Sequence, residues 1–442
     1  MFVEEVKKEL TEHIIPFWKG LRDDEYGGYY GYLSHELCLN KKAVKGCILN
    51  SRILWFFSNA YLVLGDEDLL LEAKHAFDFL ERFCLDKEYG GVYWSLNYDG
   101  TVYDSTKHTY NQAFAIYALS SYYDASGDKE AFALAKELQS VIEEKCTDEI
   151  GYLEAFKADF SPESNEKLSE NGVMAEKTMN TLLHVLEAYT ELYRVTKSEN
   201  DTSAELSETA AFTKKRLEFM LDTIADKIYN PTLMRQEVFF DKDFHSLIDL
   251  HSYGHDIETA WLVDRTLEIL DEEVYTERLR PVTAALTKKI YERAYVDHSL
   301  LNECERGVDN TDRIWWVQAE TVVGFLNGYE KSGDEKLLAA AKDVWGYIKE
   351  YQIDHREGSE WFYAVKEDHM PDPDKPIVEE WKCPYHNGRM CFEVIKRDQR
   401  CAEIRIGKAQ APVGCEQPGL RTCEFRAGNA LISVSHQKNN AK

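Results

Sequence analysis

Two histidines and one glutamate in segment 251–258 have the residue types and the spacing that chemistry needs. His251, His255 and Glu258 lie at positions i, i+4 and i+7, so in a helix they share one narrow face. Such a group is costly to bury without a function. It suits proton transfer near neutral pH or metal binding, although Ser follows His251 where a zinc peptidase has Glu. Both functions stay open here. We interpret His251 as a supporting residue and expect His255 and Glu258 to form an acid/base pair.

A second candidate base is His386, in the sequence Trp381-Lys-Cys-Pro-Tyr-His386-Asn-Gly-Arg389. Pro384 favours the start of a helix at this point and so places His386 at the helix N-terminus. The helix dipole there lowers the pKa of an imidazole and favours its neutral form, which acts as a base. The alternative is a histidine that only caps the helix.

Two further helical segments carry polar residues among apolar ones. Asn180 and His184 are four residues apart and share a helix face, although a single histidine in such a place is also typical of a hydrophobic core. Arg52 interrupts an apolar helix, and a buried arginine needs an anionic partner. We expect that partner to be Glu258, Glu320 or a substrate oxyanion.

The elements that must position these residues repeat along the chain. Gly65-Asp66, Gly127-Asp128 and Gly333-Asp334 each follow an apolar helical segment and precede an amphipathic one. Glycine ends the first helix and aspartate caps the second. The unit is a helix hairpin of about 60–70 residues, a period that indicates a stacked or closed array. Six units predict an all-α fold, an (α/α)6 barrel of six helical hairpins with short β hairpins or strands in its loops.

A second regularity predicts that the six units close into a ring. Each apolar helix begins with polar or chemically capable residues, at intervals of 58 to 74 residues. In a closed ring these ends converge on one mouth, which explains why separate helices carry costly polar groups at the same end. The positions are Arg52, Tyr110, His184, His255, Trp316 and His386.

Composition limits what such a mouth could bind. The formal net charge of −27 argues against nucleic acid and anionic membrane surfaces as partners, because both are polyanions. A neutral small molecule fits best, and the 26 Tyr, 20 Phe and 9 Trp residues suit stacking on sugar rings as well as core packing. Trp315 and Trp316 cannot both face inward, so one of them is expected to meet a sugar.

The cysteines and the two ends of the chain predict location and boundaries. With no Cys-x-x-Cys pair and no apolar signal segment, we expect a cytoplasmic protein, as a monomer or weak homo-oligomer. Residues 1–397 are expected to form the barrel domain. Residues 398–442 form an atypical tail, rich in basic residues and without a clear helical period, which we predict to be disordered or loosely attached.

Five segments resemble the N-acylglucosamine 2-epimerase superfamily, and within it the cellobiose 2-epimerases. In chain order they are Ser-Arg-Ile-Leu-Trp-Phe-Phe (51–57), Lys-Thr-Met-Asn (177–180), His-Ser-Tyr-Gly-His-Asp-Ile-Glu (251–258), Trp-Trp-Val-Gln-Ala-Glu (315–320) and Trp-Lys-Cys-Pro-Tyr-His-Asn-Gly-Arg-Met (381–390). The resemblance covers residues 1–397. It implies an (α/α)6 barrel without cofactor or metal. The implied activity interconverts reducing-end glucose and mannose in neutral β-1,4-linked disaccharides, cellobiose to glucosyl-mannose and lactose to epilactose.

The resemblance also implies roles for particular residues. His255 and His386 would be the acid/base pair that moves the C2 proton through an enediolate, with Glu258 supporting His255. His184 would assist ring opening or hold the intermediate, and Arg52 would stabilise the enediolate. The residues implied to line the sugar site are Tyr110, Asn180, Trp261, Trp316, Glu320 and Trp381.

Other functions stay open beside this one. A monosaccharide 2-epimerase or a mannose/glucose aldose–ketose isomerase of the same superfamily would use the same residues, the isomerase returning the proton to C1. A glycoside hydrolase on this fold needs two opposed carboxylates, for which Glu258 and Glu320 are available, but its mechanism leaves the three histidines at the mouth without a role. A non-catalytic sugar-binding barrel is the remaining alternative.

Overall fold

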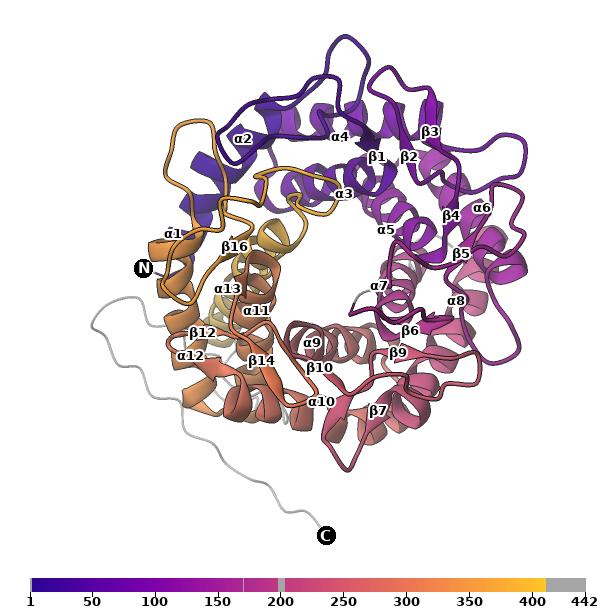
Figure 1. Ribbon diagram of the computed structural model, residues 1–442. Helices are drawn as coiled ribbons and strands as arrows, with labels where there is room; N and C mark the ends of the chain where they lie inside the picture. Colours follow the sequence, from indigo (N-terminus) through magenta and orange to yellow (C-terminus); the bar gives the residue numbers. More distant parts are fainter. Residues whose placement is uncertain (1, 170, 198–202, 411–442) are drawn as a thin grey trace.

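Six helices form a closed inner ring, and a second set of helices surrounds it (Figure 1). The computed structural model describes residues 2–169, 171–197 and 203–410, the last ten of these by their backbone alone. The inner helices are α3 (Cys47–Leu64), α5 (Thr109–Ser126), α7 (Met179–Thr196), α9 (Tyr253–Leu270), α11 (Trp315–Ser332) and α13 (His386–Gln410). Each inner helix contacts the next, and α13 contacts both α11 and α3, so the ring closes as predicted.

Outer helices alternate with inner helices along the chain, and several of the outer helices end in a π-helical turn. The outer α-helices are α1 (Phe2–Glu9), α2 (Ile15–Gly20), α4 (Glu67–Phe79), α6 (Lys129–Lys145), α8 (Ala204–Thr223), α10 (Glu273–Arg293) and α12 (Glu335–Tyr347). The π-helical turns are η1 (Leu10–Ile14), η2 (Leu80–Cys84), η3 (Ile224–Ile228) and η4 (Ile348–Gln352). The sixth hairpin is completed by the other end of the chain, because α1 packs against α13.

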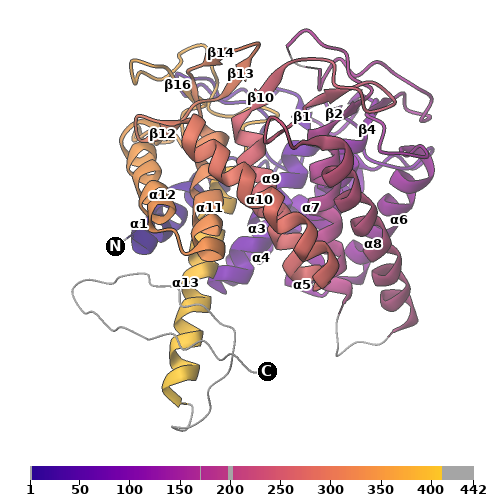
Figure 2. The same ribbon diagram turned by 90° about the horizontal axis from the view of Figure 1, so that it is seen from below.

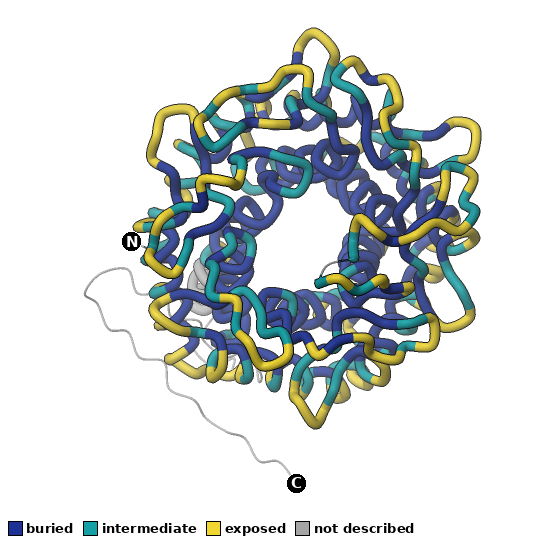
Figure 3. Tube along the Cα trace, viewed as in Figure 1, coloured by how far each residue is buried: buried dark blue, intermediate teal, exposed yellow. Residues whose placement is uncertain are grey.

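Burial separates the two layers (Figure 3). In α3 every residue from Cys47 to Ala60 is buried, as expected of a helix that is apolar on all sides. Among the described helices, α3 is also the one long and apolar enough to cross a membrane, and 78% of that stretch is buried inside the ring. The outer helices α4, α6 and α12 bury one face and expose the other.

The Gly-Asp pairs act as predicted at the turns between inner and outer helices. Gly65, Gly127 and Gly333 end their helices with φ of 72°, 70° and 73°, in the left-handed region that glycine tolerates. The aspartate that follows each glycine accepts a hydrogen bond from the backbone N–H two residues later and so caps the outer helix.

Short strands gather at the end of the barrel where the inner helices begin (Figure 2). The strand before each of five inner helices pairs antiparallel with a strand that follows the outer helix of the same hairpin, as β1–β2, β4–β5, β6–β9, β10–β13 and β15–β16. The strands are β1 (Lys45–Gly46), β2 (Ser95–Leu96), β3 (Val102–Asp104), β4 (Lys107–His108), β5 (Ala155–Phe156), β6 (Lys177–Thr178), β7 (Tyr229–Asn230), β8 (Arg235–Gln236), β9 (Phe239–Phe240), β10 (Leu250–Ser252), β11 (Tyr295–Val296), β12 (Ser299–Leu300), β13 (Glu303–Glu305), β14 (Val308–Asn310), β15 (Arg313–Ile314) and β16 (Ala364–Val365).

A buried ion pair recurs at this end ahead of four of the inner helices. Its lysine lies two to four residues before the helix, and the lysine side chain is at most 1% exposed. A buried charge needs such a partner. The pairs are Lys45–Asp23 at 2.6 Å, Lys107–Asp86 at 2.8 Å, Lys177–Asp148 at 2.5 Å and Lys382–Glu360 at 2.5 Å. Together they fix where the inner helices start, and therefore where their first side chains lie.

Two expectations need correction. His251 lies in strand β10, before α9 begins at Tyr253, so it does not share a helix face with His255. The chain also does not lose helical structure after residue 397, because α13 continues to Gln410 and projects below the ring (Figure 2). A long helix that starts in the wall of the ring can extend past it without a break. The rest of the predicted tail, residues 411–442, lies outside the described residues.

Candidate active site

The chemically capable residues meet at the strand-covered end of the ring, each in the first turns of an inner helix. Arg52 is on α3, Tyr110 on α5, His184 on α7, Glu258 on α9 and Glu320 on α11. All five are buried. The convergence that the repeat predicted is therefore present.

His386 begins α13, as predicted, and is held by Glu320. Its Nδ1 lies 2.8 Å from Oε1 of Glu320, whose other oxygen accepts a hydrogen bond of 2.9 Å from the indole Nε1 of Trp261. Burial, and after it the charge of Arg389, lowers the pKa of His386 well below its usual range. The ring is therefore neutral at physiological pH. Trp261 is only 1% exposed, so it supports Glu320 from behind and offers no open face to a sugar.

His184 has a carboxylate partner of its own. Its Nδ1 lies 2.9 Å from Oε2 of Glu187, one turn along α7, and the hydroxyl of Tyr385 donates to the same oxygen. Burial alone would raise the pKa of Glu187, but Arg389 and His184 bring it down to about 2. Glu187 is thus ionised and can only accept hydrogen bonds.

Arg389 lies at the centre of the cluster and contacts the carboxylates that hold His184 and His386. One of its terminal nitrogens donates to Glu187 and to the Tyr385 hydroxyl. The other donates to Glu258 and lies 2.7 Å from Oε1 of Glu320. Burial, and next the charge of Glu320, raises the pKa of Glu258 to about 7, and the second oxygen of Glu258 is buried without a partner among the described residues.

His255 is held differently from the expected way. Its Nδ1 lies 2.7 Å from the hydroxyl of Ser252, which precedes α9, whereas the carboxylate of Glu258 is engaged by Arg389. The direct pairing of Glu258 with His255 is therefore wrong for this structure. A guanidinium that reaches both Glu258 and Glu320 outcompetes a neutral imidazole for the carboxylate. Burial lowers the pKa of His255 to about 3, so this ring is also neutral.

Trp316 links the two histidines. Its ring centroid is 4.8 Å from that of His255 and 5.5 Å from that of His386, and its side chain is half-buried. Trp315, by contrast, is buried against Tyr363. The expectation that only one of the two tryptophans faces the mouth is thus met, and Trp316 is the one.

Arg52 has no carboxylate within ion-pair distance among the described residues. It donates to the Tyr110 hydroxyl at 2.9 Å and to the backbone oxygen of Trp381 at 3.4 Å, with Sγ of Cys383 at 3.8 Å. Its Nε is buried without a partner among those residues. Of the partners that the sequence left open, Glu258 and Glu320 do not pair with Arg52, and the third, an oxyanion of a substrate, stays a prediction.

Two further predicted residues lie beside members of the cluster. Trp381 is half-buried and packs edge-on against Tyr110, with ring centroids 5.9 Å apart, and against Trp94 at 5.6 Å. Asn180 lies one turn before His184 on α7, and its Oδ1 is buried without a hydrogen-bond partner among the described residues. A buried acceptor of this kind is suited to a hydroxyl group of a ligand.

The carboxylates of the cluster favour neither a metal site nor a hydrolase. Ligand atoms of Glu258, Glu320 and His386 all lie within 4.8 Å of one another, which a metal could bridge. The space between the two carboxylates, however, is filled by the guanidinium of Arg389, which already supplies the positive charge. A glycosidic bond cannot lie between them for the same reason.

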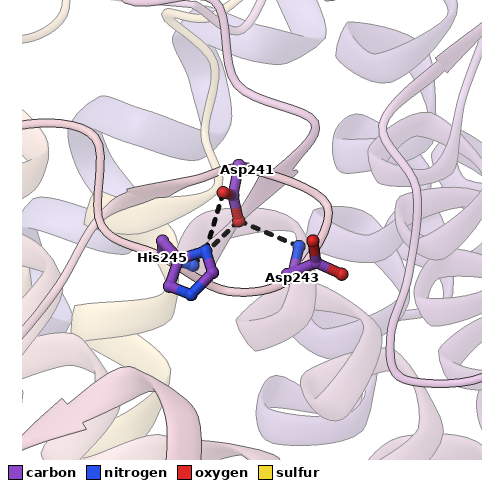
Figure 4. A group of neighbouring side chains, drawn as sticks. All are labelled: Asp241, Asp243 and His245. Atoms are coloured by element: carbon purple, nitrogen blue, oxygen red, sulfur yellow. Dashed lines mark hydrogen bonds and ion pairs between the residues drawn. The ribbon is translucent and has the colours of Figure 1, made fainter.

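A second group with ligand atoms, Asp241, Asp243 and His245, lies in an exposed turn (Figure 4). Asp241 accepts hydrogen bonds from the backbone N–H groups of the other two residues. In this turn the backbone N–H of Asp241 donates to the backbone oxygen four residues later, and the backbone oxygen of Asp241 accepts from the N–H three residues later. The same two backbone bonds recur in turns that have Asn97, Lys157 or Lys366 at the position of Asp241. The fold therefore makes this turn whether or not a ligand atom is present, and the cluster is explained as a turn.

Sequence reasoning missed three partners of the predicted residues. Glu187 and Arg389 were not given roles, although each lies three residues after a candidate histidine, and Ser252 was overlooked before His255. The i, i+3 spacing after His184 and His386 was the available signal.

Comparisons with known proteins identify the family of the chain. The family described as N-acylglucosamine 2-epimerase (GlcNAc 2-epimerase) matches residues 28–387. The chain is 53% identical over 399 residues to the cellobiose 2-epimerase of Eubacterium cellulosolvens, covering 89% of this chain and 98% of that protein. It is 52% identical over 397 residues to the cellobiose 2-epimerase of Ruminococcus albus, with 90% and 99% covered. The crystal structure of a sugar epimerase from a ruminal bacterium matches with a TM-score of 0.85 at 52% identity, covering 90% of this chain and 99% of that one.

Proposed function

The chain belongs to the N-acylglucosamine 2-epimerase family and is an epimerase, and from that premise we propose that it epimerises the reducing-end glucose of neutral β-1,4-linked disaccharides at C2. Cellobiose would give glucosyl-mannose, and lactose would give epilactose. The relatives named above, cellobiose 2-epimerases at 52–53% identity, support this choice of substrate. The observation that carries the proposal is the placement of two neutral histidines, His255 and His386, in contact with one half-buried indole, that of Trp316.

The reaction needs a base that is neutral at physiological pH. In the open-chain sugar the proton on C2 is weakly acidic because the C1 aldehyde stabilises the resulting carbanion as an enediolate. A neutral imidazole takes this proton, and return of a proton to the opposite face of C2 gives the epimer. Two histidines that contact the same aromatic surface provide a donor and an acceptor for the two faces.

The negative charge of the enediolate needs a cation that is not already neutralised. Arg52 meets that need, because its described neighbours are a hydroxyl, a backbone oxygen and a thiol. A preorganised guanidinium stabilises developing charge without reorganisation during the reaction. His184, on α7, would assist ring opening.

The test is incubation with cellobiose in deuterated water, followed by NMR of the products. We expect glucosyl-mannose with deuterium at C2. His255→Asn and His386→Asn should each abolish incorporation while the protein stays folded, and His245→Gln, in an exposed turn, should not. A ketose would instead indicate an aldose–ketose isomerase, free glucose would indicate a hydrolase, and full exchange by both histidine variants would refute the assigned roles.

A further inference from the structure

Arg389 connects the partners of two histidines that lie on different inner helices. It is on α13, yet its guanidinium reaches Glu187 on α7, Glu258 on α9 and Glu320 on α11. Glu187 in turn holds Nδ1 of His184, and Glu320 holds Nδ1 of His386. One fully buried cation is thus a common partner of both histidine–carboxylate pairs.

We propose that Arg389 is a positioning residue that keeps His184 and His386 in one tautomer, with the proton on Nδ1 and the lone pair of Nε2 directed to the substrate. The proposal rests on the proposed function, because it assigns a task to the same site. Arg389 does not touch the sugar in this scheme; it acts through Glu187 and Glu320.

Hydrogen-bond donors surround the carboxyl group of Glu320. Trp261 Nε1 and the Arg389 nitrogens can only donate, and they contact both oxygens of this carboxyl group. An ionised Glu320 satisfies these donors and leaves an acceptor for Nδ1 of His386. If Glu320 were protonated, its own hydrogen would compete with them. The same holds for Glu187, which accepts from Arg389, the Tyr385 hydroxyl and His184.

Burial alone would protonate these carboxyl groups. Each is at most 4% exposed, and removal from water favours the neutral acid. The charge of Arg389 opposes this effect of burial at all three carboxyl groups: the pKa of Glu187 falls to about 2, whereas burial still holds the pKa of Glu320 above its usual value and that of Glu258 at about 7. The other charged and titratable groups that face the cluster include Arg52, His255, Tyr110, Tyr117 and Tyr385. Arg52 contacts none of the three carboxylates, so no second cation replaces Arg389 among the described residues.

A protonated carboxyl group would change the tautomer of the histidine that it contacts. A neutral acid donates its hydrogen to Nδ1, which forces the imidazole hydrogen onto Nε2. A ring with hydrogen on Nε2 cannot accept a proton there. Loss of the guanidinium therefore removes the basic nitrogen from the cavity without moving either ring, which predicts a loss in kcat larger than any change in KM.

The test compares Arg389→Lys with Arg397→Lys. Arg397 is a matched control, because it is buried on the same helix and paired with Glu393 and Glu330, away from the histidines. Lysine keeps the charge but cannot span three carboxylates. Histidine tautomers are read by 15N NMR of the imidazoles, with His184→Asn and His386→Asn used for assignment, and kcat and KM are measured on cellobiose over a range of pH.

We expect Arg389→Lys to remove the Nδ1–H form from at least one of the two rings and to lower kcat by about 100-fold or more, in the range of lost acid/base catalysis. KM should change less than kcat, and Arg397→Lys should behave as the wild type. Retention of the Nδ1–H form by both rings, or an unchanged kcat, overturns the proposal.

Glu187→Gln provides a second route if Arg389→Lys does not fold. It disconnects one arm of the network, so we expect His184 to lose its Nδ1–H form while His386 keeps it. A change at both rings or at neither refutes the proposed connection. The tautomer measurement does not need turnover. If the wild type fails to epimerise cellobiose, the proposed function is refuted, whereas the tautomers still test the role of Arg389.

Discussion

Nδ1 of His386 lies 2.8 Å from Oε1 of Glu320, so this contact leaves Nε2 as the ring nitrogen that can meet a substrate. Glu320 was expected to line the sugar site. Instead it lies behind the histidine, with its second oxygen bound to Trp261. A residue that orients a base in this way affects the rate of proton transfer more than the binding of the sugar.

Replacement of Glu320 by glutamine should therefore lower kcat with little change in KM. The amide can still accept from Trp261, but it also has two hydrogens that can turn toward Nδ1 and reverse the tautomer of His386. We expect a loss of about 10²–10⁴-fold in kcat, measured with cellobiose. Glu330→Gln is the matched control, because Glu330 lies lower on the same helix and pairs with Arg397. Wild-type kcat in Glu320→Gln would contradict this role.

The protein should lose stability as the pH decreases, because of a buried histidine that takes no part in the reaction. His108 precedes α5, is 1% exposed, and has a buried Nδ1 without a partner among the described residues. Burial lowers its pKa to about 3, whereas the unfolded chain titrates near 6.5. Below pH 6.5 the unfolded state therefore binds one proton more than the folded state. The free energy of unfolding falls by about 1.4 kcal/mol per pH unit from this residue, down to about pH 3, and is constant above pH 6.5.

The measurement is urea denaturation of the wild type and His108→Gln at pH 7 and pH 5. The loss of stability between the two pH values should be about 2 kcal/mol smaller in the variant. The comparison uses the difference in pH dependence, so packing changes common to both pH values cancel. An equal pH dependence in wild type and His108→Gln would show that this ring is not kept neutral by the fold.

Gly254 should be intolerant of a methyl group because of Trp316. A Cβ at this position would lie 2.6 Å from the indole of Trp316 and 2.7 Å from Val317, closer than carbon atoms approach. Gly254→Ala must therefore displace the ring that contacts both His255 and His386. Overpacking of this kind costs about 1–3 kcal/mol, or about 10–100-fold in kcat/KM if the strain appears at the site.

The control for Gly254→Ala is Gly346→Ala in α12, where a Cβ would meet no atom within 4 Å. There we expect unchanged kcat/KM and a gain of about 0.5–1 kcal/mol in stability, because alanine is the better helix former. A double variant that also carries Trp316→Leu should lose much of the effect of Gly254→Ala on kcat/KM. If the effect is the same in both backgrounds, the clash with Trp316 is not its cause.

The repeat in the sequence allowed the ring to be predicted, but the contacts across the ring could not be predicted. Helix ends and caps depend on neighbouring residues, so Gly65-Asp66 could be interpreted from the sequence alone. The bond from Arg389 to Glu187 joins residues 202 apart, and the bond from Arg389 to Glu258 joins residues 131 apart. Local spacing predicts His255 as the partner of Glu258. Arg389 is the stronger partner, but only closure of the ring brings it into contact with Glu258.

The buried pair Lys107–Asp86 should contribute to stability because it cannot be broken on one side without cost. Lys107 is fully buried, lies 2.8 Å from Asp86, and also donates to the backbone oxygen of Gly90. Lys107→Met leaves Asp86 without its counter-charge, and removal of one partner of a buried pair costs about 3–5 kcal/mol. The free energy of unfolding in urea should fall by that amount. The double variant Lys107→Met/Asp86→Asn should recover part of it, because the neutral amide needs no cation.

Lys74→Met is the control: Lys74 and Asp78 form an exposed pair, and such pairs contribute about 0–1 kcal/mol. A loss in Lys107→Met as small as that in Lys74→Met would mean that the lysines ahead of the inner helices do not hold the mouth together.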